Sequence, residues 1–273
     1  MIYQTFKPHP DLQGFIKCYW ILQVPAEPNP QKQKAIADGY IEMIFHLADD
    51  VRTYTEDKGY TIQPRAMILG HPVKPFFFEP TGTVDTFSVR FHPYGFSNLI
   101  DLPLKEITDK VLPLEELFGQ EFAHQAIHLI TQAESTQSRI AVIESLLFKR
   151  ITTPQMVNHI IKNTIDTMMI SKGSPSINVL TKENNTFRRQ LERKFTQHIG
   201  LSPKQIGKVI RFQTALHILL NQPEEKSSRI AYDAEYHDQA HFIRDFKQFT
   251  GLTPKSFFEA PSMKVASLMY AGE

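Results

Sequence analysis

Arginine, glutamate and glutamine side chains occur at helical spacing in two stretches of the C-terminal half of this 273-residue chain. The first set stands at i, i+3 and i+4, and consists of Arg189, Glu192 and Arg193. The second set shares one face of another expected helix, and consists of Gln239, Ala240, Ile243 and Arg244. Arginine can donate two parallel hydrogen bonds to guanine, glutamate can accept one from cytosine, and small apolar side chains can contact the thymine methyl group. Both sets therefore suit the edges of base pairs in a DNA major groove.

Each set also has a simpler interpretation. Charged and amide side chains normally cover the solvent-exposed face of an amphipathic helix. In that case Glu192 forms an intrahelical ion pair with a neighbouring arginine. Either stretch taken alone leaves both interpretations open, so the elements that position these side chains have to be considered.

The second set requires a helix that begins after Asp238, a residue type that caps helix N-termini. Three phenylalanines recur on the opposite side at i, i+4 and i+7, namely Phe242, Phe246 and Phe249. Gly251 is expected to end this helix. A shorter helix is predicted from Ser228 to Ala234, so two helices joined by a tight turn are expected, as in helix-turn-helix units.

A similar unit is predicted between Ser176 and Phe195. Ser176 is expected to cap its first helix, Asn185 to take a left-handed conformation in the turn, and Thr186 to cap the second helix. Apolar residues at i, i+4 and i+8 then face inward, namely Phe187, Leu191 and Phe195. The outward face of the second helix carries the first set of polar residues.

A long connecting helix is predicted from Pro203 to Asn221, with Ser202 as its cap. The sequence Gly-Leu-Ser/Thr-Pro follows both recognition stretches, at residues 200–203 and 251–254. The plan of helix, turn and recognition helix thus occurs twice, about fifty residues apart. Two such helices in one chain suit successive major grooves, which lie about 34 Å apart on one face of the duplex.

The charge distribution supports a division into two domains. The chain has 41% hydrophobic and 22% charged residues, which is typical of globular proteins, and its length suffices for two cores. Residues 1–153 carry 14 Lys and Arg against 18 Asp and Glu, whereas residues 154–261 carry 15 against 10. We therefore expect one domain at 1–150 and a basic, DNA-facing domain at 154–261, with the boundary near 151–153.

Residues 1–95 contain short apolar segments separated by turn signals, which predicts a β-barrel or β-sandwich. The expected strands lie at 15–22, 40–47, 52–55, 60–62, 67–70, 75–78 and 86–91, with a hairpin turn at 56–59. Helices are predicted at 113–118, 121–132, 136–149 and 154–171. The helices ahead of the boundary suit either pairing with a second subunit or packing on the sheets.

The doubled unit resembles the AraC/XylS family of bacterial transcriptional regulators. The second unit matches the closing signature of that family through Ile230-Ala231, Tyr236, Asp238 to Phe242, Arg244, Phe246-Lys247, Gly251 and Thr253-Pro254. The first unit matches through Leu191, Arg193, Phe195, Gly200, Ser202 and Pro203. The resemblance covers about residues 154–260 and implies an all-α domain with two helix-turn-helix motifs joined by a long helix.

The resemblance implies the same base-facing residues that periodicity places outward, and we expect Arg189 and Arg193 to carry more of the sequence readout than Gln239 and Arg244. The chain departs from the family pattern in both turns and at two further positions. Glu235 and Asn185 replace turn glycines, Ala240 replaces a serine, and Phe187 replaces a serine cap. Glutamate adopts positive φ poorly, so the second turn is expected to be strained.

The N-terminal half resembles, less specifically, the cupin-like β-barrel sensor domain of some of these regulators. The matching pieces are Tyr19-Trp20, Asp38 to Phe45, Gly70 and Val89 to Pro93. The whole chain is thus expected to be an α+β protein of two domains. Trp20, Glu42 and Arg90 are candidates for effector binding. A buried Arg90 needs a partner, and an ion pair with Glu42 is favoured over an anionic effector.

Metal-dependent chemistry is the alternative function. Four residues would suit zinc, iron or manganese if a barrel brings them together, namely Glu42, His46, His71 and His92, and the protein would then be a cupin enzyme fused to a DNA-binding module. The sequence has no paired metal-ligand motif, phosphate loop or nucleophile elbow, and it contains one cysteine, Cys18. We therefore expect no enzymatic activity, no metal and no cofactor.

The remaining expectations concern partners and location. The N-terminus lacks the pattern of a signal peptide and no apolar run is long enough to cross a membrane, so a cytoplasmic protein is expected. The expected partners are double-stranded DNA, a small-molecule effector, a second copy in a homodimer, and RNA polymerase if the protein activates transcription. In a third interpretation the barrel binds no ligand and only dimerises; an open pocket lined by Glu42 or Arg90 would argue against it.

Overall fold

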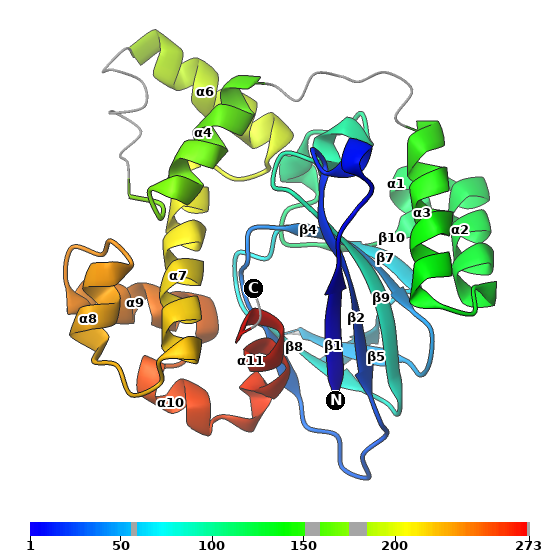
Figure 1. Ribbon diagram of the computed structural model, residues 1–273, viewed down its shortest axis with the longest axis horizontal. Coiled ribbons are helices and arrows are strands. Elements are labelled where there is room, and N and C mark those ends of the chain that lie inside the picture. Colours follow the sequence, from blue (N-terminus) through cyan, green and yellow to red (C-terminus); the bar gives the residue numbers. More distant parts are fainter. Residues whose placement is uncertain (56–58, 151–158, 175–184, 272–273) are drawn as a thin grey trace.

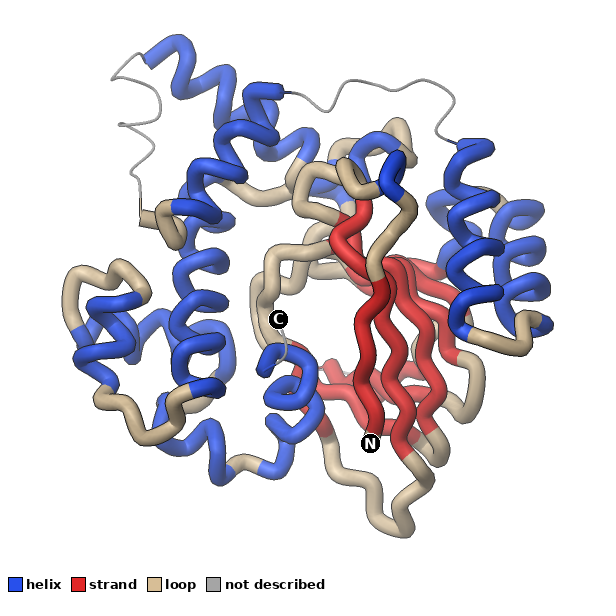
Figure 2. Tube along the Cα trace, viewed as in Figure 1, coloured by secondary structure: helices blue, strands red, loops and turns tan. Residues whose placement is uncertain are grey.

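The computed structural model describes residues 1–55, 59–150, 159–174 and 185–271. A strand-rich N-terminal half with three helices on one side lies beside a helical C-terminal half (Figures 1 and 2). The order of a strand-rich region followed by helices confirms the predicted fold class. The expected boundary at 151–153 lies outside the described residues.

The strands of the N-terminal half form two antiparallel sheets. The six-stranded sheet has the order β1 (Ile2–Phe6), β2 (Ile16–Val24), β9 (Val84–Phe91), β4 (Ile41–His46), β7 (Ala66–Leu69) and β10 (Val111–Pro113). The four-stranded sheet has the order β3 (Gln33–Ala35), β8 (Phe76–Pro80), β5 (Val51–Thr55) and β6 (Gly59–Ile62). Among the described residues the hydrogen-bonded ladders stay in these two sheets and do not join into one ring.

The central strands β4 and β9 are buried along nearly their whole length. One face of their sheet packs under three helices, α1 (Leu114–Phe118), α2 (Gln120–Gln132) and α3 (Thr136–Arg150). Small residues of α2, Ala123 and Ala126, are fully buried and let that helix approach the sheet closely. The structure therefore shows the packing role that was one of the two alternatives for these helices.

The C-terminal half contains seven described α-helices and several caps that the sequence predicts. The helices are α4 (His159–Ile170), α6 (Asn185–His198), α7 (Pro203–Asn221), α8 (Ser227–Asp233), α9 (Gln239–Thr250), α10 (Pro254–Glu259) and α11 (Lys264–Ala271). Ser202 caps α7 in a reciprocal arrangement with Gln205, and Pro203 occupies its first turn. Asp238 caps α9, and Gly251 ends that helix in the left-handed conformation. The described residues also include four short 3₁₀ turns, at Pro10–Leu12, Phe96–Asn98, Leu104–Glu106 and Pro261–Met263.

Two local predictions differ from the structure. Helix α6 already begins at Asn185, so this residue is helical and the left-handed turn predicted for it is wrong; likewise Thr186 lies inside the helix. Four further elements were not predicted from the sequence, namely β1, β3, β10 and α11. The predicted helix beginning at Ser176 and the first residues of the predicted 154–171 helix fall outside the described residues.

None of the helices within the described residues is both long and apolar enough to cross a membrane.

Candidate functional site

Helix α9 presents to solvent the face that the sequence predicts. Gln239, Ala240 and Arg244 are exposed and Ile243 is half-buried. The opposite face carries Phe242, Phe246 and Phe249, which are buried against the aromatic side chain of Phe212 and its neighbours on α7. The three phenylalanines fix the rotation of the helix about its axis, and this rotation places the second set of candidate residues outward.

The turn between α8 and α9 contains the strain that was expected there. Glu235 has φ of 59°, the left-handed region that a glycine would occupy without cost. The next residue, Tyr236, is buried against Phe242 and the edge of His241. The packing of Tyr236 thus stabilises the turn, and Glu235 adopts the unfavourable backbone conformation as a result.

Helix α6 presents the first set of candidate residues. Arg189 and Arg193 are exposed, and Glu192 is half-buried. Glu192 accepts a hydrogen bond from Nε of Arg188 at 3.2 Å, so the predicted intrahelical pair exists but with a different arginine. The inward residues Leu191 and Phe195 pack on apolar side chains of α4 and α7.

Helix α7 connects the two units and contributes polar contacts to both. Arg211 donates from Nη2 to the carbonyl oxygen of Gly173 at 2.8 Å and lies over the ring of Tyr236. Lys208 pairs with the buried Asp245 of α9 at 3.0 Å and donates to Gln248 at 2.8 Å. These contacts hold α9 against α7, and α6 packs on the same helix, so α6 and α9 are both joined to α7 (Figure 1).

Sequence reasoning missed the pair formed by Lys208 and Asp245. Asp245 stands between Arg244 and Phe246 on a helix whose period places it at the margin of the apolar face. A carboxylate at such a position requires a cation when it is buried, and that requirement was the available signal.

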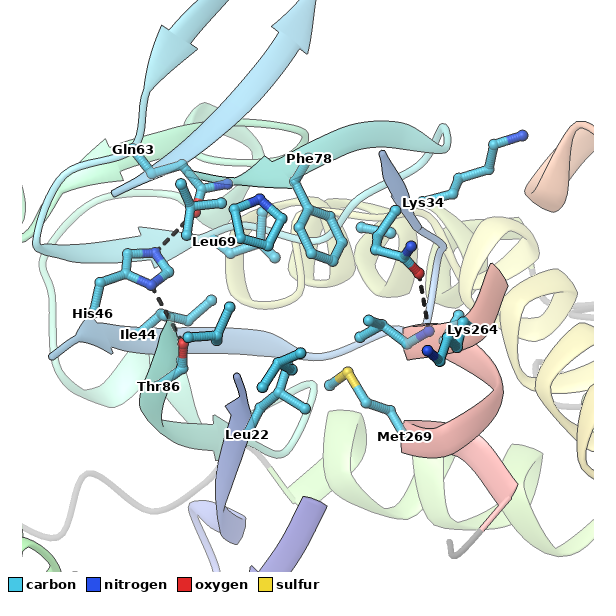
Figure 3. Close-up of a pocket in the computed structure, with 18 of the residues that line it drawn as sticks. Leu22, Lys34, Ile44, His46, Gln63, Leu69, Phe78, Thr86, Lys264 and Met269 are labelled. Carbon is cyan, nitrogen blue, oxygen red and sulfur yellow. Dashed lines mark hydrogen bonds between the residues drawn. The ribbon is translucent and has the colours of Figure 1, made fainter. Parts of the chain in front are cut away.

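The second candidate site is a cavity of about 280 Å³ between the two sheets and α11 (Figure 3). The three residues predicted for effector binding all line it, namely Trp20, Glu42 and Arg90. Strands β4 and β9 pair in a register that sets Glu42 directly opposite Arg90. Arg90 donates from Nε to Glu42 at 2.7 Å, and Trp20 donates from Nε1 to the same carboxylate at 2.9 Å.

This buried group extends to the C-terminal helix. Arg90 lies 3.7 Å from the carboxylate of Asp38, to which the hydroxyl of Tyr270 on α11 donates at 3.3 Å. Burial raises the pKa of Asp38 to about 6, although the nearby Arg90 guanidinium opposes this. The structure thus contains the Glu42–Arg90 ion pair that the sequence analysis favoured, and Asp38 and Tyr270 enlarge it.

A neutral polar cluster lies at another part of the cavity wall, and the sequence analysis did not predict it as a binding group. His46 Nε2 lies 2.8 Å from Oε1 of Gln63, and His46 Nδ1 lies 3.4 Å from the hydroxyl of Thr86 (Figure 3). Gln63 in turn donates to the hydroxyl of Thr53 at 2.6 Å. Burial lowers the pKa of His46, which favours the neutral imidazole.

The four residues considered as metal ligands occupy separate places. Glu42 belongs to the Arg90 group, and His46 to the neutral cluster. His71 is fully buried and lies beside the backbone of Ile199, while His92 stacks on Tyr94. Within the described residues, no three His, Cys, Asp or Glu side chains are grouped so that they could hold a metal ion.

The N-terminal and C-terminal halves are in direct contact. Lys34 of β3 donates to the carbonyl oxygen of Thr250 at 2.8 Å, at the end of α9. Ile36 and Ala37 belong to the apolar cluster of α7, α8 and α9, and Tyr94 belongs to that of α4 and α6. The strands that line the cavity and the helices α6 and α9 are therefore joined through packed side chains.

Two family models match separate parts of the chain. Residues 180–260 match the family model of a helix-turn-helix domain, and residues 4–113 match that of a domain of unknown function, DUF6597. A curated protein of Haemophilus influenzae, described as an uncharacterized HTH-type transcriptional regulator, is 34% identical over 76 residues. This match covers 28% of the present chain and only a quarter (25%) of the length of the relative.

Solved structures of ToxT from Vibrio cholerae resemble the chain at low identity. The 1.65 Å structure has a TM-score of 0.48 and 11% identity, and the similarity covers 98% of this chain and 99% of ToxT. ToxT bound to (E)-4-(8-methylnaphthalen-1-yl)but-3-enoic acid has a TM-score of 0.47 and 11% identity, with coverage of 99% and 100%.

Residues 180–260 thus form a helix-turn-helix domain that includes α6 and α9 with their exposed polar faces. The matched domain includes the signature residues of the second unit that carry the resemblance to AraC-type regulators.

Proposed function

We propose that the protein regulates transcription by binding a specific sequence of double-stranded DNA in the cytoplasm, with α6 and α9 in two successive major grooves. The observation that carries this proposal is the outward placement of two polar, basic helix faces on one connecting helix. Helix α7 has 19 residues, which at 1.5 Å per residue corresponds to roughly 28 Å. This length is close to the roughly 34 Å between successive major grooves on one face of the duplex.

The side chains differ in what they offer to DNA. Arg189 and Arg193 are exposed and suit bidentate bonds to guanine, and Glu192 suits cytosine or the orientation of a neighbouring arginine. On α9, Gln239 and Arg244 contribute affinity and position. Ala240 and Ile243 offer apolar contact to thymine methyl groups. We therefore assign most of the sequence readout to α6.

We further propose that residues 1–150 form a domain that responds to a small molecule, whereas residues 154–261 form the DNA-binding domain. The cavity beside Trp20, Glu42 and Arg90 supports this role. The cavity also argues against an N-terminal half that serves only for dimerisation. A half with that role alone would be expected to have its interior filled by side chains. A homodimer, and contact with RNA polymerase if the protein activates transcription, are further parts of the proposal.

The substitution Arg193→Ala tests the DNA-binding assignment. Binding of the full chain to the DNA upstream of its own gene is measured at one stated salt concentration, on the natural site and on a set of single-base variants. Loss of a bidentate contact is expected to cost about 1–3 kcal/mol and to remove discrimination at one base position.

Lys7→Ala is the matched control, because it removes one exposed positive charge from the N-terminal half. It should leave the preference at every base position unchanged. If Arg193→Ala behaves in the same way, or if wild-type binding is independent of sequence, the proposed role of α6 is wrong.

A further inference from the structure

The cavity between the sheets is mainly apolar and has one neutral polar region. Its apolar wall includes Leu22, Ile44, Leu69, Phe78 and Met269 (Figure 3). The polar region consists of His46, Gln63 and Thr86, and the latter two are more than nine-tenths buried. The volume, about 280 Å³, lies near the lower limit of roughly 300 Å³ for typical ligand pockets, which indicates a small ligand.

The charged groups along the wall are already engaged. Arg90 is paired with Glu42 and Asp38. Lys34 donates to the carbonyl oxygen of Thr250 and lies over the ring of Phe77, so its ammonium points away from the cavity (Figure 3).

The other charged positions lie at the solvent-facing edge. Lys264 is 64% exposed and lies 3.9 Å from Glu27, and the N-terminal Met1 is exposed as well. An ionised ligand would therefore lose water in the cavity without gaining a charge partner deep inside it, and burial of such a charge is costly.

The neutral cluster retains hydrogen-bonding capacity toward a ligand. The His46 ring donates to Gln63 and accepts from Thr86 in the tautomer that satisfies both contacts. A hydroxyl oxygen that donates one hydrogen bond keeps lone pairs with which it can accept, and a primary amide has a second N–H. Thr86 can thus accept from a ligand hydroxyl group, and Gln63 can donate to the same hydroxyl oxygen.

Helix α11 of the C-terminal half completes the cavity. Val265, Met269 and Tyr270 of α11 line it. The helix is held to β3 through Gln33, whose Oε1 accepts from the backbone N–H of Val265 at 3.1 Å. Gln33 Nε2 also donates to the carbonyl oxygen of Pro261 at 3.2 Å. A molecule in the cavity therefore touches the sheets and the C-terminal half at the same time.

We propose that this cavity binds a neutral, mainly apolar small molecule whose hydroxyl group donates to Thr86 and accepts from Gln63, and whose apolar part packs against α11. Binding fastens α11, and with it the C-terminal half, to the N-terminal sheets. The inference rests on the proposed small-molecule response of residues 1–150 and names the ligand class and the coupling element.

The test compares three probes of equal chain length on the full-length protein at pH 7.5: 1-octanol, octanoate and octylammonium. Octanol is expected to raise the melting temperature in a saturable way, and the two ions are expected to have little effect. Thr86→Val should weaken octanol binding about three- to tenfold, the loss of one hydrogen bond. Thr83→Val is the matched control, because Thr83 is exposed and precedes the same strand.

Amide hydrogen exchange on the wild-type protein supplies a readout that needs no variant. Octanol should slow exchange in residues 264–271 of α11, and octanoate should not. Equal or greater stabilisation by octanoate overturns the neutral ligand class, and absence of any saturable shift overturns the site. Unchanged exchange in α11 overturns the coupling. DNA binding does not enter these readouts, so either proposal can fail while the other stands.

Discussion

Glu235 adopts a left-handed backbone conformation that glutamate disfavours. The αL conformation costs a non-glycine residue about 1–2 kcal/mol relative to the right-handed region, and Glu235 lies in it with φ of 59°. Its backbone N–H donates to the carbonyl oxygen of Tyr232 at 3.1 Å, and the following N–H of Tyr236 donates to that of Ala231 at 2.9 Å. The tertiary packing of Tyr236 therefore outweighs the local preference of a glutamate.

Glu235→Gly should stabilise the protein by about 0.5–1 kcal/mol, because relief of the backbone strain exceeds the extra chain entropy of glycine. Chemical denaturation of the full chain measures the change as a higher midpoint at unchanged slope. Glu235→Gln keeps the strain and removes only the charge, so it should give no such gain. A gain of equal size in both variants would assign the effect to charge instead.

Gly200 shows how one turn between elements depends on another part of the chain. It follows α6 with φ of 83°, and its carbonyl oxygen accepts from the hydroxyl of Thr108 at 3.1 Å. A β-carbon at this position would meet the Thr108 hydroxyl and would lie 2.7 Å from the carbonyl oxygen of Leu104. The turn between α6 and α7 can therefore dock on the N-terminal half only with a glycine there.

Gly200→Ala is expected to destabilise the protein by more than the backbone strain of about 1–2 kcal/mol, because the methyl group also enters occupied space. Gly59→Ala is the matched control. Gly59 has φ of 72° but open space around the added carbon, so it should show the strain alone. Equal losses of unfolding free energy in the two variants would mean that the close approach of Gly200 to Leu104 does not exist in solution.

At the scale of the whole molecule, the two halves share buried side chains instead of meeting at a solvated surface. His71, in the segment after β7, is one of them. It is 1% exposed, and among the described residues its ring nitrogens have no hydrogen-bond partner of ordinary geometry, although the backbone of Ile199 faces the ring. Burial lowers the pKa of His71 to about 4.

The contribution of His71 to the stability of the protein is therefore expected to fall as the pH decreases from about 6.5 to about 4. In this window the unfolded chain binds a proton at His71 and the folded chain does not, so protonation favours unfolding by up to about 3 kcal/mol. Asp38 acts in the opposite direction: its pKa is raised to about 6, so its contribution to stability is lost as the pH rises from about 4 to 6.

Comparison with His71→Leu isolates the histidine contribution, because every other group titrates in both proteins. When the pH is lowered from 7 to 4.5, the change in unfolding free energy should be more favourable to the folded state in the variant than in the wild type, because the unfavourable His71 contribution is absent. His124 is exposed, so His124→Leu should retain the wild-type difference. An unchanged pH dependence in His71→Leu would show that this residue is not buried as a neutral group.

The sequence determined the features that depend on neighbours along the chain. The bounds of α7, the caps at Ser202 and Asp238, and the outward faces of α6 and α9 all follow from residue type and helical period. Glu42 and Arg90 could be proposed as partners, since a buried arginine requires an anion. These signals are local because capping and periodicity act over a few residues.

Only the tertiary structure decided the features that depend on register and docking. The pairing of β4 with β9 set Glu42 opposite Arg90 and brought His46 and Thr86 together. The short strand β3 and helix α11 carry no strong pattern of their own, yet they join the halves and close the cavity. Their positions result from contacts between residues more than two hundred positions apart, which no local preference of the sequence encodes.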